Sequence, residues 1–196
     1  MPTGYQILKQ DASYFLTMQV VEWVDIFSRK RYRDILCDSL NFCSEKKGLQ
    51  IFSYVIMSNH CHMLARAANG NLSNVIRDLK KHTCNRIIES VINEPESRRE
   101  WMLDLFQKAA SKHKRNEHYQ FWTHENNAQE IYSQDFTLQK IIYIHNNPVR
   151  AGLVNRPEEY IYSSAKNYVG EIGIVKVFPI DLHMLMSGKD SWRIKY

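Results

Sequence analysis

Residues 49–67 read Leu49-Gln-Ile-Phe-Ser-Tyr-Val-Ile-Met-Ser-Asn-His-Cys-His-Met-Leu-Ala-Arg-Ala67, and this stretch decides the fold. Two largely apolar runs, 49–57 and 60–67, lie on either side of a short link, Met57-Ser-Asn. Runs of this length and composition are typical of strands, and a polar link this short is typical of a tight turn. We therefore expect an antiparallel β-hairpin near the centre of the chain.

Outward from the hairpin, apolar spacing predicts further strands and helices on both sides. The expected elements, in chain order, are a strand beginning at Tyr14, a helix over 31–47, strands over 49–57 and 60–67, a helix over 72–91, a short amphipathic helix within 93–118, a strand over 119–123 and a helix from Ser133 to Pro148. Proline disfavours helical backbone in the residue before it, so we expect that last helix to end at Pro148. This order of elements favours an α+β fold, a ferredoxin-like antiparallel sheet with helices packed on one face.

The composition narrows the class of protein. No apolar run approaches the roughly 20 residues of a membrane span. The N-terminal residues lack the charged start and apolar middle of a signal peptide, so we expect a cytoplasmic protein with no membrane partner. None of the four cysteines forms a Cys-x-x-Cys pair, and we expect free thiols that behave as small apolar side chains.

The charge balance is modestly basic. The 196 residues include 26 Lys and Arg against 21 Asp and Glu, a formal net charge of +5, which permits a polyanionic partner without requiring one. Several basic residues occur at helical spacing or directly after the last predicted helix. They are Arg77, Lys80, Lys81, Arg86 and Arg150. We expect them to contact phosphate groups, and the alternative is an ordinary solvated helix surface.

Two histidines in the hairpin are candidates for a metal site. In a strand, successive side chains point to opposite faces, so His60 and His62 share one face and Cys61 faces the other way. Two imidazoles two residues apart can share a metal ion. The alternative is a pair of partly exposed histidines without a ligand.

A second motif lies at the end of the last predicted helix. Tyr143 and Asn147 are four residues apart, so they share one side of the helix. The Asn147 amide oxygen is a candidate third metal ligand. The alternatives are a packing role for Tyr143 and a C-terminal cap for Asn147.

Together the two motifs resemble a known family. Met57-Ser-Asn-His-Cys-His-Met-Leu and Tyr143-Ile-His-Asn-Asn-Pro-Val-Arg-Ala-Gly-Leu-Val are similar to HUH-type single-tyrosine transposases. The likeness is greatest to the branch called REP-associated tyrosine transposases, and it runs from about Tyr14 to Tyr168. The family's middle motif position is usually a larger aliphatic residue than Cys61, and some relatives have glutamine at the position of Asn147.

The resemblance implies an activity and roles for four residues. Tyr143 is expected to attack single-stranded DNA and to form a covalent 5′-phosphotyrosine, which a second 3′-hydroxyl then reverses to join strands. His60, His62 and Asn147 are expected to hold Mg²⁺ or Mn²⁺. The implied substrate is a DNA hairpin beside a single-stranded cleavage site, and the implied assembly is a monomer or a homodimer.

The resemblance also suggests a division of the chain. We expect residues 1–170 to form the transposase catalytic domain, with an insertion around 93–118, and residues 171–196 to form a C-terminal tail of unknown role. Two other functions stay open: a non-catalytic nucleic-acid-binding protein on the same fold, and a metal-dependent hydrolase in which Tyr143 is structural. The transposase hypothesis requires Tyr143 to lie beside His60 and His62 in the folded chain.

Overall fold

The computed structural model describes residues 6–112 and 118–186, and it contains one four-stranded antiparallel sheet. The strands are β1 (Tyr14–Gln19), β2 (Leu49–Ile56), β3 (His60–Ala67) and β4 (Gln129–Glu130). The α-helices are α1 (Lys30–Lys46), α2 (Leu72–Asn93), α3 (Arg99–Ser111), α4 (Gln134–Arg150), α5 (Ala165–Tyr168) and α6 (Leu182–Met186), and the short 3₁₀ turns are η1 (Val21–Trp23), η2 (Ile26–Ser28) and η3 (Pro157–Glu159). The strand order β2-β3-β1-β4 confirms the predicted α+β, ferredoxin-like class.

The predicted hairpin forms one side of this sheet, with β2 at the edge and β3 in the interior. Met57 N donates to His60 O across the turn at 2.8 Å, and β2 pairs with β3 from there to Ala67. On its other side β3 pairs with β1, so that Thr17 lies opposite His62. β3 therefore has a hydrogen-bonded neighbour on both sides, which fixes the positions of its alternating side chains.

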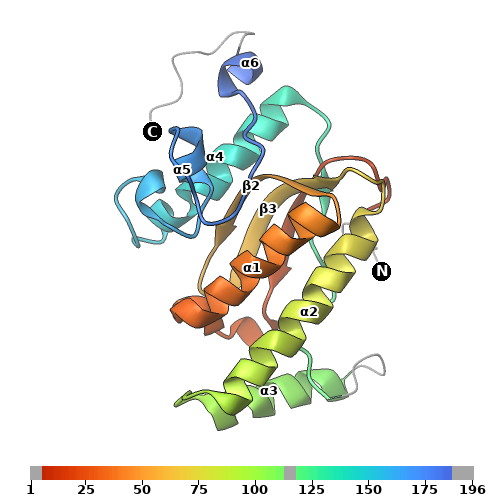
Figure 1. Cartoon of the computed structure of the whole chain (residues 1–196), viewed down its shortest axis with the longest axis vertical. Coiled ribbons are helices and arrows are strands. Elements are labelled where there is room, and N and C mark those ends of the chain that lie inside the picture. The colour runs from red at the N-terminus through yellow and green to blue at the C-terminus, as the bar shows by residue number, and fades with distance from the viewer. Residues whose placement is uncertain (1–5, 113–117, 187–196) are drawn as a thin grey trace.

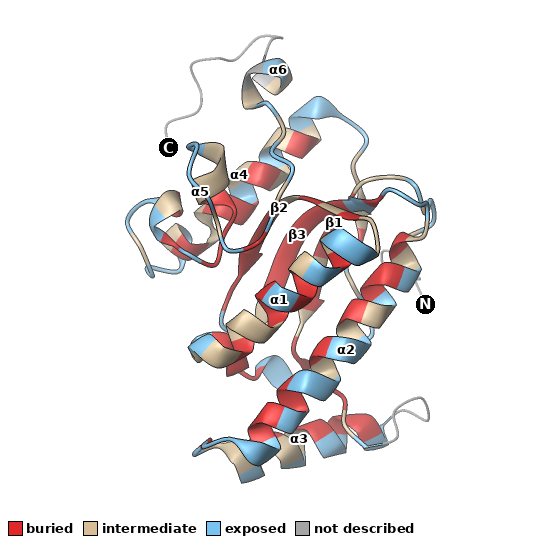
Figure 2. Cartoon of the chain, in the orientation of Figure 1, coloured by how far each residue is buried: buried red, intermediate tan, exposed pale blue. Residues whose placement is uncertain are grey.

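The helices α1 and α2 cover one face of the sheet, and α4 lies across the other (Figure 1). The first face is apolar: Leu16, Met18, Cys61 and Met63 are completely buried there (Figure 2). The expectation that the helices pack on one face holds for α1 and α2 only. The helix α4 departs from it because it has its own apolar side, with Ile144 buried against the opposite face of the sheet.

The fourth strand is not where the sequence predicted it. Residues 119–123 make a single antiparallel bridge to the end of β1, between Trp122 and Val20, and the strand β4 follows at Gln129–Glu130. The alternating pattern of a strand fails here because Phe121 and Trp122 are both buried. The Trp122 indole turns toward α2, where its Nε1 donates to Thr83 Oγ1 at 2.9 Å.

The end of α4 was also predicted wrongly. The helix continues through Pro148 to Arg150, because proline so near the end removes only one backbone donor. The chain then reverses at Gly152, whose φ is +70°. Gly152 N donates to Val149 O and Leu153 N donates to Pro148 O, at 2.9 Å each, which is the Schellman arrangement at a helix end. Asn147 is therefore held in regular helix.

The insertion around 93–118 contains the predicted short helix, α3, and is tied to α1 by a buried carboxylate. Glu96 forms an ion pair with Arg29 at 2.8 Å and accepts a hydrogen bond from the Tyr32 hydroxyl at 3.0 Å. The residues at the end of the insertion, 113–117, lie outside the described part of the chain.

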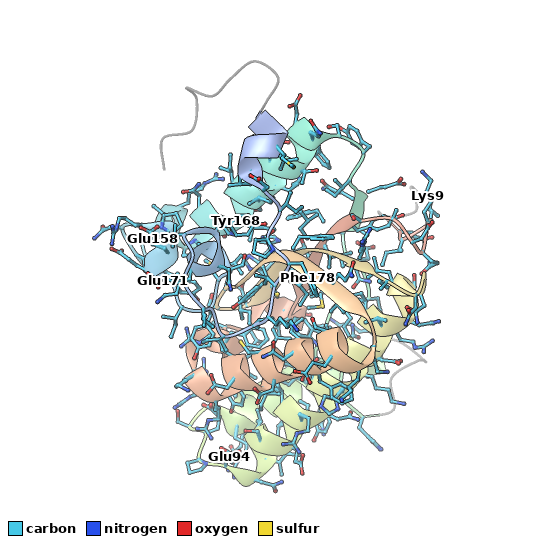
Figure 3. All side chains as sticks on the ribbon, turned by 45° about the horizontal axis from the view of Figure 1, so that its top comes forward. Lys9, Glu94, Glu158, Tyr168, Glu171 and Phe178 are labelled. Atoms are coloured by element: carbon cyan, nitrogen blue, oxygen red, sulfur yellow. The ribbon has the colours of Figure 1, made fainter. Side chains whose placement is uncertain are left out.

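The segment after α5 packs back onto the sheet. Val175 is buried, and Phe178 N donates to Ile51 O of β2 at 2.8 Å. Tyr168 and Phe178 mark the two ends of this packed stretch (Figure 3). The predicted division of the chain at residue 170 stays a prediction. Among the described helices, none is both long and apolar enough for a membrane span.

Candidate active site

The two histidines of β3 lie side by side on the α4 face of the sheet. Their ring centroids are 4.6 Å apart, with an edge-to-face arrangement. Cys61, between them in sequence, is completely buried on the other face, as the strand alternation predicted. The two histidines differ in solvent exposure: His62 is buried, with 6% of its surface exposed, and His60 is half-buried.

Each imidazole has a polar neighbour at Nδ1. Thr17 Oγ1 lies 2.9 Å from His62 Nδ1, and Asn59 Oδ1 lies 2.7 Å from His60 Nδ1. Because the Asn59 oxygen can only accept, the proton of neutral His60 lies on Nδ1, and the Nε2 lone pair is left available. The Thr17 hydroxyl can hold His62 in the same tautomer. Partners of this kind orient the imidazoles of metal sites.

Burial keeps both imidazoles uncharged near neutral pH. It lowers the pKa of His60, and it lowers the pKa of His62 to about 3, with smaller electrostatic contributions from His60 and Lys140. A metal ion binds the neutral form of histidine, so this environment suits a ligand. The residue types, their spacing and their charge state therefore fit a divalent metal ion.

Tyr143 of α4 lies directly beside the histidine pair. Its hydroxyl is 3.5 Å from His62 Nε2, and the two ring centroids are 5.2 Å apart. Phe15 of β1 packs against both rings, stacked on His62 and edge-on to Tyr143. The phenol is 37% exposed, so it remains accessible from outside. A single chain thus brings together the phenol and the His62 imidazole, which the sequence places 81 residues apart.

Asn147 follows Tyr143 by one helical turn and is half-buried. Within residues 6–112 and 118–186, no group of three or more His, Cys, Asp or Glu side chains is arranged to hold a metal ion. A metal ion bound by His60 and His62 would therefore need a ligand of another type. An amide oxygen one turn beyond Tyr143 is a ligand of the type that Mg²⁺ and Mn²⁺ accept.

His145 takes no part in this arrangement. It is buried on another side of α4, where its Nε2 lies 2.9 Å from Ser164 Oγ and its ring meets Tyr168 edge-on. At helical pitch it is about 200° from Tyr143, which agrees with this placement. Its contacts pack α4 against the segment that leads into α5.

Two cations lie near the Tyr143 ring. The Arg150 guanidinium carbon is 5.9 Å from the ring centroid, so this predicted DNA contact lies at the site. Lys140 Nζ is 6.0 Å from the same centroid, and sequence reasoning missed it. The signal was present, because Lys140 precedes Tyr143 by three residues and so lies on the same side of the helix.

The other predicted DNA contacts lie on α2, which is on the other side of the sheet from Tyr143. Arg77, Lys81 and Arg86 are exposed there, and Arg77 and Arg86 pair with Asp78 and Glu89. Lys80 is half-buried, burial lowers its pKa to about 8, and its Nζ donates to Thr123 O at 2.9 Å. Arg77, Lys80 and Lys81 line a groove with the segment 118–128, away from Tyr143.

Comparison with known proteins agrees with the fold and the motifs. The structure is similar to one described as the REP-associated tyrosine transposase bound to a REP hairpin, with a TM-score of 0.59 and 16% sequence identity over 92% of this chain and 93% of that one. No curated protein sequence gives a significant match. The sequence profile described as "Transposase IS200 like" matches residues 11–147, which make up most of the chain and include His60, His62, Tyr143 and Asn147. This chain belongs to the IS200-like transposase family.

Proposed function

We propose that this protein cleaves single-stranded DNA and transfers the cut strand through a covalent 5′-phosphotyrosine at Tyr143. One observation carries the proposal: the Tyr143 hydroxyl lies 3.5 Å from His62 Nε2, next to the second imidazole of His60. A nucleophile beside a metal-binding pair is the arrangement that metal-assisted phosphoryl transfer requires. Membership of a transposase family supports the same reaction class.

The residues have separate tasks in this reaction. His60 and His62 would hold Mg²⁺ or Mn²⁺, with Asn147 as the third ligand, and Thr17 and Asn59 would keep the imidazoles oriented. When bound, the metal ion offsets negative charge on a non-bridging oxygen of the scissile phosphate. Phe15 packs against the Tyr143 ring and so restricts where the phenol oxygen can point.

The covalent step exchanges one phosphoester for another. The Tyr143 oxygen forms a bond to phosphorus and loses its proton, while the bond from phosphorus to the 3′-oxygen breaks and that oxygen takes up a proton. The product is a 5′-phosphotyrosine and a free 3′-hydroxyl. Because no phosphoester is lost, another 3′-hydroxyl can reverse the step and join strands without ATP.

The proposed substrate is a DNA hairpin beside a single-stranded cleavage site. The similar structure is of a protein bound to a REP hairpin, and the half-exposed phenol is accessible to a flexible strand. Arg150 would contact a phosphate near Tyr143, and Arg77, Lys81 and Arg86 would contact more distant DNA. Since the phenol and the imidazoles meet within one chain, we propose that a monomer acts in cis.

The test is formation of a protein–DNA adduct. Wild-type protein is incubated with Mn²⁺ and single-stranded oligonucleotides that carry a hairpin, and the products are separated on a denaturing gel. We expect an adduct with wild type and none with Tyr143→Phe, which lacks only the attacking oxygen. Tyr132→Phe is the matched control, because Tyr132 is 78% exposed and phenylalanine keeps the ring that stacks on Phe136, so its adduct should match that of wild type.

His60→Ala separates cleavage from DNA binding. We expect this variant to lose most of the adduct while it still binds the oligonucleotide, because phosphate contacts do not depend on the metal ion. An undiminished adduct in Tyr143→Phe would reject Tyr143 as the nucleophile. Cleavage without any adduct would favour the metal-dependent hydrolase, and binding without cleavage would favour the non-catalytic binding protein.

A further inference from the structure

The Lys140 ammonium group is held among aromatic rings at the site. Its Nζ lies 4.4 Å from the ring centroid of Phe15, 4.9 Å from that of Phe136 and 6.0 Å from that of Tyr143. The three rings come from β1 and from both neighbouring turns of α4. They fix the position of a side chain that in solution would move freely.

This cation has no anionic partner in the described part of the chain. The ion pairs and side-chain hydrogen bonds formed within residues 6–112 and 118–186 do not include Lys140. Aromatic faces leave the three N–H donors of an ammonium group without an acceptor. Partial burial also lowers the pKa of Lys140, because the charge is partly removed from water. A charge that is partly removed from water is stabilised when an anion completes its surroundings.

We infer that Lys140 binds the DNA phosphate that Tyr143 attacks. This inference rests on the proposed function, and it adds a protein side chain that contacts the reacting phosphate. A phosphate oxygen supplies both the negative charge and the acceptor that Lys140 lacks, and such charged hydrogen bonds are strong. Lys140 would then stabilise the charge that builds up on the phosphate during transfer.

The position of Arg150 extends this inference to the path of the strand. Lys140 and Arg150 both lie within 6.0 Å of the Tyr143 ring, one from each side along the helix. Because these charged groups lie 6.0 Å and 5.9 Å from the same ring centroid, they are at most about 12 Å apart, and one short stretch of DNA backbone can contact both. The cleaved strand would therefore run along α4, with Tyr143 between two cations, and the α2 residues would contact other DNA.

A purely structural role for Lys140 predicts a different result. If Lys140 only packs on the rings, Lys140→Met should change stability and leave the chemistry intact, because methionine also packs well against aromatic rings. If it binds the attacked phosphate, Lys140→Met should fold normally and react slowly. Lys140→Arg, which keeps the charge and the donors, should recover most of the rate.

The first measurement is the rate of adduct formation at saturating oligonucleotide, under single-turnover conditions with Mn²⁺. We expect Lys140→Met to be about 10- to 100-fold slower than wild type, the effect of losing one hydrogen bond to a charged group. Lys46→Met is the matched control: Lys46 is an exposed lysine at the end of α1, on the other face of the sheet, and its loss should not change the rate. If Lys140→Met has a clearly lower melting temperature than wild type, Lys140→Gln is used in its place.

The second measurement locates the contact without requiring cleavage. The scissile position is read from the length of the wild-type product, and its phosphate is replaced by an uncharged methylphosphonate. In a Tyr143→Phe background, this replacement should weaken binding several-fold when Lys140 is present and much less when it is methionine.

These results separate the two proposals. A wild-type protein that forms no adduct would reject the proposed function, and the role of Lys140 with it. A normal wild-type adduct with an equally fast Lys140→Met would overturn the Lys140 inference alone. So would a Lys140→Arg variant as slow as Lys140→Met, or methylphosphonate effects that do not depend on residue 140.

Discussion

The two faces of the sheet differ in polarity and in burial, although the strand β3 contributes side chains to both. On the α1 and α2 face, β3 places Cys61 and Met63, which are completely buried among apolar side chains. On the α4 face, the same strand places His60 and His62, and His62 meets a half-exposed phenol whose ring has a lysine nearby. Because strand side chains alternate, eight residues of sequence supply core and candidate site together.

The difference indicates that stability and chemistry are largely separable in this fold. The α1 face excludes water from large apolar surfaces, the dominant favourable contribution to folding. The α4 face keeps polar groups in fixed positions, where their orientation matters more than their burial. Substitutions on the two faces should therefore have different effects, and the predictions below test that division.

The largest effect on stability should come from the apolar face. Leu36 of α1 is completely buried, and Leu36→Ala should lower the free energy of unfolding by about 2–5 kcal/mol through lost burial and a residual cavity. Below its melting temperature the folded variant should bind Mn²⁺ as wild type does. Urea unfolding and calorimetric titration measure the two quantities. A loss of metal affinity in the folded variant would show that the faces are coupled.

The apolar face is also the part of the fold that the sequence predicted best. The helices α1 and α2 and the hairpin follow directly from apolar spacing, with Gly48 ending α1 at a φ of +70°. The fourth strand was misplaced because it lies at the edge of the sheet, where pairing with a single neighbour tolerates an irregular path. The apolar run that suggested a strand, around Phe121 and Trp122, is instead core packed toward α2 and α3.

The candidate site was predictable where it depends on local geometry. Strand alternation placed His60 and Cys61 on different faces of the sheet, and helical spacing placed Tyr143 and Asn147 on one side of α4. Local patterns could not reveal the meeting of His62 with Tyr143, which depends on how α4 crosses the sheet; only the family resemblance pointed to it. Helical spacing already placed Lys140 on the Tyr143 side of α4, but its contact with Phe15 of β1 depends on the same crossing of α4 over the sheet.

A smaller effect should come from the side of α4 that is turned away from the site. Burial lowers the pKa of His145 to about 4 from an ordinary value of 6.5, and its neighbours there are the Ser164 hydroxyl and the Tyr168 ring. The unfolded histidine takes up a proton near pH 6.5, and the folded one does so only near pH 4. The stability contributed by His145 is therefore complete above pH 6.5 and is lost as the pH falls toward 4.

The size of this loss is of the order of 3 kcal/mol, from a pKa difference between the folded and unfolded states. In His145→Gln, which keeps a polar atom near Ser164, the free energy of unfolding should fall less between pH 6.5 and pH 4 than in wild type. The comparison uses urea unfolding across this pH range, and the other histidines contribute equally to both proteins. Parallel curves would mean that His145 is charged, or already exposed, in the folded state.

The smallest effect should come from a single oxygen on the polar face. Thr17→Val keeps the shape of the side chain and removes the hydroxyl 2.9 Å from His62 Nδ1. Partners of metal-bound histidines contribute about 10- to 100-fold to affinity, so Mn²⁺ should bind at least about tenfold more weakly to the variant. The free energy of unfolding without metal should change by less than about 1 kcal/mol, since Thr17 is only half-buried.

Thr17→Ser is the control for this prediction, because it restores the hydroxyl and should restore most of the Mn²⁺ affinity. Titration calorimetry gives the affinities, and thermal unfolding without metal gives the stabilities. If Thr17→Val bound Mn²⁺ as tightly as wild type, His62 would not need its neighbour for orientation. If instead the stability of Thr17→Val fell and its Mn²⁺ affinity did not, the polar face would contribute to folding as the apolar face does. The division between the two faces would then fail at Thr17, where the two roles are easiest to separate.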